Sequence, residues 1–306
     1  MNAPAWADGG MDTSEIVVVG GGFAGVWTAA AASAVRADHV LALDKHLRSL
    51  ADRPVSAARD TVVVIGAGFA GIELATTLPT RLRGLLPTQR VRVVLAEAGP
   101  VVGPGLGDGP RPVITAALDE AGVEVLVGRR LVRLDASTVH FADGSSVPTS
   151  TVVWTGGMVA GPLAAGLDAD VDELGRVAVD RFLRIPRHPH VYAAGDTAAA
   201  TDPDGHPVLQ SCQHAIPLGK YAGHNAANDL IGRPLEPFDP GPYITCLDLG
   251  PAGAVLTTGW NRDVRLVGEQ AKAIKKAICE SYIHPPHNPA ELYAMARARP
   301  HPELSL

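Results

Sequence analysis

Two glycine-rich loops are the parts of this sequence whose residue types and spacing could do chemistry. Each loop has the spacing glycine-x-glycine-x-x-glycine, follows a run of β-branched residues directly, and precedes a segment of small, helix-forming residues. The first glycine permits a tight turn, the second leaves room for a pyrophosphate, and the third lets the helix pack close to the strand. Free N–H groups at the helix N-terminus then face the anion. The glycines concerned are Gly20, Gly22 and Gly25 in the first loop and Gly66, Gly68 and Gly71 in the second.

The second loop has a candidate acidic partner in Glu97. This residue ends the apolar run VRVVLAE, where the carboxylate that binds the adenosine ribose belongs in a dinucleotide-binding domain. Such a carboxylate accepts a hydrogen bond from the 2′-hydroxyl and repels a 2′-phosphate, so it favours NADH over NADPH. The simpler alternative is a solvated glutamate at the end of a strand.

The elements that must position these loops alternate between strands and helices. Apolar β-branched runs predict strands at 15–20, 61–66 and 91–99, and the segments after the two loops predict helices. An Ala-rich helix is expected over 212–232, with further strands near 244–249, 253–258 and 264–267 and helices at about 268–282 and 289–298. This order predicts an α/β protein.

Composition excludes several classes of protein. The chain has 306 residues, enough for two modest domains, and 46% hydrophobic residues, as in globular proteins. A net charge of −6 gives no basic field that would attract nucleic acid. Cys212, Cys246 and Cys279 form no CxxC pair, which argues against a zinc ribbon and a redox-active disulfide and favours the cytoplasm, and we expect no metal site. The longest apolar run, 61–79, contains Glu73 and a glycine cluster, so we expect no membrane span.

The order of the motifs resembles the FAD/NAD-linked reductase superfamily of flavoproteins with two dinucleotide-binding domains, the pyridine nucleotide-disulfide oxidoreductase fold. Within it the chain looks most like type II NADH dehydrogenases and their soluble relatives. The matching stretches are VVVGGGFAG, VVVIGAGFAGIELA, HFADGSSVPTSTVVWTGG and HVYAAGDTA, followed by QHAIPLGKYAGHNAA and AVLTTGW. They extend from about residue 15 to residue 282. Because no cysteine precedes Cys212, the disulfide reductases of the superfamily are excluded.

The resemblance implies a role for each motif and the cofactors FAD and NADH. The first glycine loop would hold the FAD pyrophosphate, and the second loop with Glu97 would hold NADH. The remaining implied residues are Gly156 and Gly157 beside the nicotinamide, Gly195 and Asp196 at the FAD ribityl or phosphate region, and Gln213 beneath the flavin ring. Glu73 is the implied proton-handling group, with an ordinary first-turn glutamate as the alternative. Asp196 has a helix cap as its alternative.

The implied reaction is hydride transfer from NADH to the flavin and then electron transfer to a small-molecule acceptor, for which quinone is the family default. The cofactors carry this chemistry, and the protein supplies orientation and electrostatics. We therefore expect NADH and a small-molecule acceptor as partners, with no nucleic acid and no stable membrane insertion. The expected protein is a cytoplasmic monomer or homodimer with at most transient contact with a membrane surface.

The chain departs from the family between its two loops. Gly25 and Gly66 are much closer in sequence than in family members, so most of the first FAD-domain segment is missing. We expect two Rossmann-like domains, with an NAD(H)-binding domain at 57–158 inserted in a truncated FAD domain formed by 11–56 and 159–245. A small C-terminal region covers 246–306. Two functions follow: a flavin-dependent NADH oxidoreductase with a minimal FAD site, or a non-catalytic NAD(H)-binding relic of such an enzyme.

Residues 39–53 allow two interpretations. They could contain a strand at 39–44 that ends in Asp44 as a ribose ligand. They could also form a helix, because Val40, Leu43, Leu47 and Leu50 fall on one helical face. We favour the helix, which the Arg53-Pro54 pair would end.

The helix expected at 268–282 has an apolar stripe and a basic flank. The stripe is formed by Ala271, Ile274, Ile278 and Tyr282, and the flank by Lys272, Lys275 and Lys276. In relatives, a helix near this point helps the enzyme to sit on a membrane surface. We favour the alternative that the stripe packs on the protein's own core or on a second subunit while the lysines are solvated.

Overall fold

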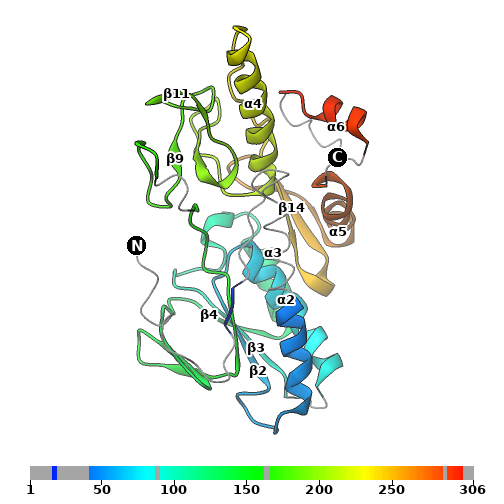
Figure 1. Ribbon diagram of the computed structural model, residues 1–306. Helices are drawn as coiled ribbons and strands as arrows, with labels where there is room; N and C mark the ends of the chain where they lie inside the picture. The colour runs from blue at the N-terminus through cyan, green and yellow to red at the C-terminus, as the bar shows by residue number, and fades with distance from the viewer. Residues whose placement is uncertain (1–15, 19–40, 87–89, 162–165, 285–287, 299–306) are drawn as a thin grey trace. The chain divides into compact units, whose positions relative to one another are not determined.

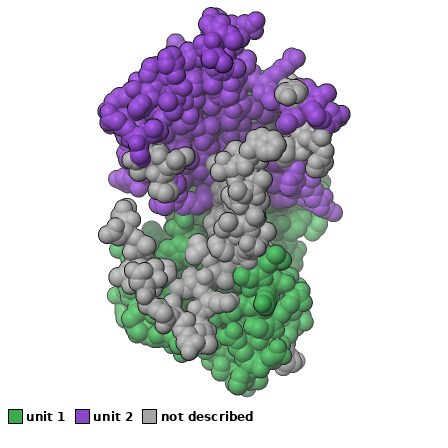
Figure 2. All heavy atoms as spheres, in the orientation of Figure 1, with its two compact units in different colours: residues 1–20, 35–157, 245–275 green, residues 21–34, 158–244, 276–306 purple. Residues whose placement is uncertain are grey.

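The computed structural model describes residues 16–18, 41–86, 90–161, 166–284 and 288–298 (Figure 1). The chain divides into two compact units, each described here by itself (Figure 2). Among the described residues, unit 1 contains those at 16–18, within 35–157 and within 245–275, whereas unit 2 contains those within 158–244 and 276–306. The predicted first glycine loop, with Gly20, Gly22 and Gly25, lies outside the described residues.

Unit 1 is built on a five-stranded parallel sheet with the strand order β1-β8-β2-β3-β4. The strands are β1 (Ile16–Val18), β2 (Thr61–Ile65), β3 (Arg92–Ala96), β4 (Val123–Leu126) and β8 (Thr151–Trp154). All five residues of β2 are buried, as expected for a parallel strand covered on both faces, which explains its unbroken β-branched run. The predicted α/β class with a Rossmann-like parallel sheet is confirmed.

Side chains of the central strands alternate between two apolar layers. Val62 and Val64 join the layer that contains α2 (Phe69–Leu85) and α3 (Arg111–Ala121). Val63 and Ile65 point to the other face, where they meet the sheet formed by β5 (Leu131–Asp135), β6 (Thr138–Phe141) and β7 (Ser146–Pro148). This two-residue period is the normal consequence of strand geometry, and it fixes the register of β2 in the sheet.

Residues 41–49 form a helix, followed by the short helix η1 (Leu50–Asp52). Leu43, Leu47 and Leu50 are buried in the core of unit 1, so the helical interpretation is confirmed for 41–52, while Val40 lies outside the described residues. Asp44 does not end a strand. Its carboxylate accepts hydrogen bonds from the guanidinium groups of Arg48 and Arg81, which ties this helix to α2.

The segment after residue 244 returns to unit 1. It forms a three-stranded sheet of β13 (Ile244–Asp248), β14 (Ala254–Thr258) and β15 (Asp263–Val267), and then α5 (Gly268–Ala277). The short helices η2 (Pro104–Leu106) and η5 (Gly250–Ala252) lie in loops of unit 1. A π-helical turn, η6 (Ile278–Tyr282), follows α5 and belongs to unit 2.

The basic flank of α5 is not fully solvated, so the expectation was wrong for two of its three lysines. The Lys272 ammonium lies 2.6 Å from the Asp248 carboxylate, and the Lys275 ammonium lies 2.7 Å from that of Glu73. Lys276 is the exposed member, with 71% of its side chain accessible. Ala271 of the apolar stripe is fully buried, whereas Tyr282 is exposed. None of the helices in the described residues is long and apolar enough to cross a membrane.

Unit 2 contains short strands and one long helix. The strands form two pairs, β9 (Val177–Ala178) with β12 (Ala198–Ala199) and β10 (Arg184–Ile185) with β11 (His188–Tyr192). The described helices are η4 (Gly195–Thr197), α4 (Cys212–Leu230), the π-helical turn η6 and α6 (Pro289–Met295). The core gathers Leu183, Val208, Leu218, Tyr221 and Phe238.

Three turns of unit 2 share one hydrogen-bond pattern that the sequence analysis did not predict. In each, an aspartate carboxylate accepts N–H groups from the residues two and four positions later and pairs with the side chain of the latter residue. The aspartates are Asp172, Asp180 and Asp202, and their partners are Arg176, Arg184 and His206. The residue before each partner has a positive φ: Gly175 at 73°, Gly205 at 88° and the non-glycine Leu183 at 68°.

Candidate nucleotide-binding site

Gly66 makes the sharp turn at the carboxyl end of β2. Its φ of 103° is one that side-chain-bearing residues rarely adopt, and a Cβ there would lie 2.7 Å from the carbonyl oxygen of Thr155. Its N–H donates to the Ala96 carbonyl at 2.8 Å, which fixes the turn to the end of β3. A glycine is therefore required at this position for two separate reasons.

Gly68 and Gly71 meet opposite surroundings. A Cβ on Gly68, the residue that precedes α2, would meet no described atom within 4 Å, so none of the described residues closes this side of the loop. A Cβ on Gly71 would lie 1.8 Å from the carbonyl oxygen of Gly66, so only glycine permits this close packing of helix against turn. A ligand could approach at Gly68, where the first N–H groups of α2 have no acceptor within the helix.

Glu97 lies against this loop and bonds to it. Its side chain is half-buried at the end of β3, and one carboxylate oxygen, Oε2, accepts the Ala67 N–H at 2.8 Å. The other oxygen, Oε1, accepts the Gly99 N–H at 2.7 Å. The alternative of a merely solvated glutamate does not describe these contacts.

Thr155 is a site residue that the sequence analysis did not single out. Its hydroxyl lies 2.9 Å from the carbonyl oxygens of both Ile65 and Gly66, so it holds the first turn of the loop from the neighbouring strand. The sequence contained a signal for this residue, because Thr155 is the first residue of the TGG motif after the strand at 151–154. The sequence analysis assigned a role only to the two glycines of that motif. Those glycines follow directly: Gly157 has a φ of 104°, and a Cβ on Gly156 would lie 2.8 Å from the Trp154 ring.

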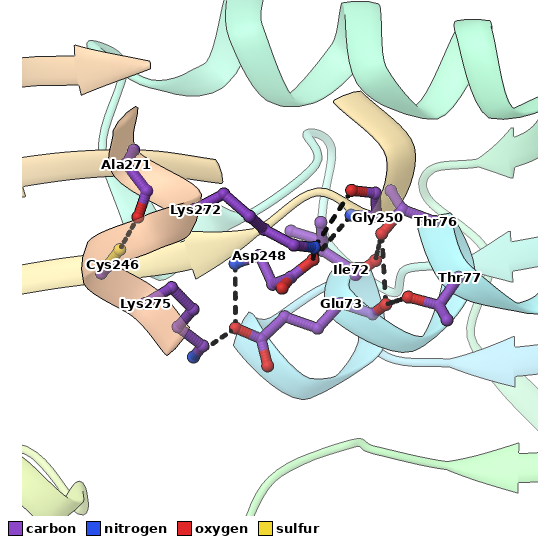
Figure 3. Close-up of polar contacts among 10 residues, drawn as sticks. All are labelled: Ile72, Glu73, Thr76, Thr77, Cys246, Asp248, Gly250, Ala271, Lys272 and Lys275. Atoms are coloured by element: carbon purple, nitrogen blue, oxygen red, sulfur yellow. Dashed lines mark hydrogen bonds and ion pairs between the residues drawn. The ribbon is translucent and has the colours of Figure 1, made fainter. Parts of the chain in front are cut away.

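Glu73 occupies a junction between three elements (Figure 3). Its Oε1 accepts the backbone N–H of Asp248 at 3.0 Å and lies 2.7 Å from the Lys275 ammonium. The Asp248 carboxylate in turn binds Lys272 and accepts the Gly250 N–H at 2.7 Å. These contacts tie α2 to β13 and α5, and the predicted part of Glu73 in proton handling stays a prediction.

The residues predicted for the flavin lie on adjacent elements of unit 2. Asp196 lies inside η4 and not at its N-cap, which is Ala194. Gly195 has a φ of 72°, and η4 contacts α4, whose second residue is Gln213. The Gln213 amide is oriented by the chain after α4, because it donates to the Pro242 carbonyl at 2.9 Å and accepts from the Ile244 N–H at 3.3 Å.

The structure therefore gathers the predicted residues in two groups. Unit 1 brings together the second glycine loop, Glu97, Gly156 and Gly157, while Glu73 points from the same helix into the junction with α5. Unit 2 holds Gly195, Asp196 and Gln213.

A glycine loop of the dinucleotide-binding type, at the end of a strand in a parallel sheet, is typical of dinucleotide-binding α/β proteins. Residues 45–219 match the family model described as pyridine nucleotide-disulphide oxidoreductase, and the chain belongs to that family. Its similarity is to NADH dehydrogenase-like members. An NADH dehydrogenase-like protein of Mycobacterium tuberculosis is 42% identical over 266 residues, which are 86% of this chain and 66% of the relative. The chain thus spans about two thirds of the length of that relative.

Other relatives carry names with a defined acceptor. A type II NADH:quinone oxidoreductase of Mycobacterium tuberculosis is 31% identical over 60% of this chain and 43% of its own length. A demethylphylloquinone reductase of Synechocystis is 28% identical over 70% of this chain and 52% of its own length. Among solved structures, a ferredoxin reductase from Rhodopseudomonas palustris matches with a TM-score of 0.55 and 25% sequence identity. The match covers 69% of this chain and 49% of the ferredoxin reductase.

Proposed function

We propose that this chain is a flavin-dependent NADH oxidoreductase whose NADH is bound in unit 1 by the second glycine loop and Glu97. The observation that carries the proposal is the geometry of the loop. Gly66 needs its positive φ, Gly71 needs the absence of a Cβ, and a Cβ on Gly68 meets nothing among the described residues. These are the three separate requirements of a pyrophosphate-binding turn.

The residues of this site fit a dinucleotide. The first N–H groups of α2, together with the helix dipole, supply an anion site beside Gly68. Each carboxylate oxygen of Glu97 has two acceptor positions, and among the described residues one backbone N–H donates to each oxygen, which leaves acceptor capacity for a ribose hydroxyl. Glu97 would favour the 2′-hydroxyl of NADH over the 2′-phosphate of NADPH. When bound, NADH supplies a hydride and a flavin accepts it.

The flavin part of the proposal is supported by the family and by three residues of unit 2. Gly195, Asp196 and Gln213 lie on elements that contact each other, and the Gln213 amide is held by the backbone at 242–244. In this proposal, 57–158 is the NAD(H)-binding domain. Residues 11–56 with 159–245 are proposed as the truncated FAD-binding domain, in which Gly20, Gly22 and Gly25 would contact the FAD pyrophosphate, and 246–306 as a small C-terminal region, although 41–56 and 245–275 lie in unit 1.

The acceptor is proposed from the relatives. Two of them are named as reductases of quinones, so we propose a quinone or a similar small molecule. Glu73 is proposed as the proton-handling group, and its carboxylate forms an ion pair with the Lys275 ammonium. The proposed protein is a cytoplasmic monomer or homodimer with at most transient contact with a membrane surface.

The decisive experiment is an absorbance spectrum of the purified chain, followed by anaerobic addition of NADH. The proposal expects bound flavin and its bleaching by NADH. The competing function, a non-catalytic NAD(H)-binding relic, expects a colourless protein that still binds NADH in a fluorescence titration. Reconstitution with added FAD before the NADH step separates a weak flavin site from an absent one.

A further inference from the structure

We infer that Glu97 has a second role, as a positioning residue that holds the glycine loop in the shape required for pyrophosphate binding. This inference rests on the proposed function and deepens it. It concerns the loop itself, whereas the role proposed above concerns the ribose. The two roles predict different outcomes when the carboxylate is removed.

The backbone of Glu97 is fixed before its side chain acts. Its N–H donates to the Leu126 carbonyl at 2.8 Å, and its carbonyl accepts the Arg129 N–H at 2.8 Å. Since Gly99 N–H binds Oε1, the carboxylate is also held from the chain that follows. A Cβ on Gly99 would lie 3.2 Å from Oε1, so glycine there leaves room for this contact. Oε2 is thereby directed at the loop.

Ala67 is the residue on which this arrangement acts. It lies between the first two glycines of the loop and is fully buried. Its N–H donates to Glu97 Oε2 at 2.8 Å, and its carbonyl accepts the Gly103 N–H at 3.0 Å. Both polar backbone groups of Ala67 are therefore bonded to the chain that follows β3, and the Glu97 carboxylate supplies one of these two bonds.

Removal of the carboxylate leaves the buried Ala67 N–H without this acceptor. An unsatisfied buried donor is unfavourable, and a bond to a charged acceptor is stronger than a bond to a neutral one. The loop can avoid this cost only by leaving the observed conformation. Any ligand that needs the observed loop then binds more weakly, in proportion to the population lost.

The two roles differ in what they predict for NADPH. If Glu97 contacted only the ribose, its removal would weaken NADH and leave NADPH unchanged or bound more tightly, because repulsion of the 2′-phosphate is gone. If Glu97 also holds the loop, both nucleotides lose affinity, because both place a pyrophosphate on the same turn. The loop role lowers the affinity for both nucleotides by a common factor, so it is detected in the affinity for NADPH and not in the ratio of the two affinities.

The test compares wild type, Glu97→Ala and Glu97→Gln in the full chain, with Glu124→Gln as the matched control. Glu124 is an exposed carboxylate on the next strand, β4, paired with Arg92. Dissociation constants for NADH and NADPH are measured at one ionic strength, and exchange of the Ala67 amide hydrogen is followed by NMR without nucleotide. We expect Glu97→Ala to weaken both nucleotides about tenfold or more, equivalent to about 1.4 kcal/mol or more, and to accelerate Ala67 exchange.

The Gln variant separates loop holding from loss of folding. Its amide oxygen can accept one of the two N–H groups, whereas its NH₂ group can accept neither, so we expect an intermediate effect. The control should change neither affinity nor exchange. Unchanged Ala67 exchange in both variants, with loss of NADH affinity alone, would overturn the positioning role and leave the proposed function standing. A wild type that does not bind NADH would refute the proposed function, while the exchange measurement would still decide the loop role.

Discussion

Gly68→Val should separate nucleotide binding from folding in unit 1. Gly68 has φ −82° and ψ −168°, an extended conformation that valine adopts readily, and its Cβ would meet no described atom within 4 Å. Loss of glycine flexibility stabilises the folded state by about 0.4–1 kcal/mol, and the poorer cap costs a similar amount. We therefore expect a change of less than about 1 kcal/mol in the free energy of unfolding.

Binding should respond very differently to this variant. The valine side chain would fill the space beside the first N–H groups of α2 and separate them from the pyrophosphate. Each hydrogen bond to a charged group is worth about 1.5–3 kcal/mol, so loss of two such bonds raises the dissociation constant for NADH by roughly two to four orders of magnitude.

The assay pairs urea unfolding with an NADH titration, and two other glycines serve as references. Gly84→Val lies in the same helix, where a Cβ also meets no described atom within 4 Å, and it should keep NADH binding. Gly71→Ala should prevent stable folding, because its Cβ would lie 1.8 Å from the Gly66 carbonyl. Wild-type affinity in Gly68→Val would refute the assignment of the anion site, and unfolding of that variant would refute the open space beside the loop.

Three further variants test other contacts. Thr155→Val removes the hydroxyl that lies beside two carbonyl oxygens, so it should lower the free energy of unfolding by about 1–3 kcal/mol and weaken NADH binding. Thr155→Ser keeps the hydroxyl and should retain both properties. Equal behaviour of the two variants would refute the role of the hydroxyl. Leu183→Gly should be no less stable in urea than Leu183→Ala, against the usual penalty for glycine, because φ is 68°; a clear further loss in the glycine variant would contradict this. Hydrogen bonds from Arg48 and then Arg81 lower the pKa of Asp44, so its stabilising contribution is present above the unfolded carboxyl pKa and is lost as pH falls through the folded pKa. Arg81→Ala should raise that pKa in an NMR titration, and an unchanged value would show that the pair does not form in solution.

The sequence predicted those features that depend on local pattern. The β-branched run at 61–65 and the spacing of Gly66, Gly68 and Gly71 determine a strand, a turn and a helix within a few residues. The leucines at 43, 47 and 50 similarly decided between helix and strand. In each case the information lies in neighbouring residues, so no distant contact was needed to interpret it.

Features that depend on distant contacts were missed or misassigned. Thr155 is 89 residues from the Gly66 carbonyl that it binds, and Asp248 is 175 residues from Glu73. Helical spacing placed the α5 lysines off the apolar stripe correctly, but it could not show which carboxylates face them. Two of the lysines meet acidic partners from α2 and β13, and only the fold brings those partners together.

Residues 245–275 contribute to the core of unit 1, the unit that carries the candidate nucleotide site. They supply Leu247, Leu249 and Val255 to the same core as α2 and α3, so this core is assembled from stretches far apart in the sequence. Arg262, in the turn between β14 and β15, is almost fully buried and donates to the Gly105 carbonyl at 3.2 Å. That carbonyl belongs to the loop after β3, the same loop whose Gly103 N–H binds Ala67. Residues 245–275 therefore help to hold the loop after β3, which in turn binds the glycine loop at Ala67. The glycine motif itself contains none of these groups. A fragment that contained the glycine loop and Glu97 but not 245–275 would lack the buried Leu247 and Leu249 and the Arg262 contact with the Gly105 carbonyl.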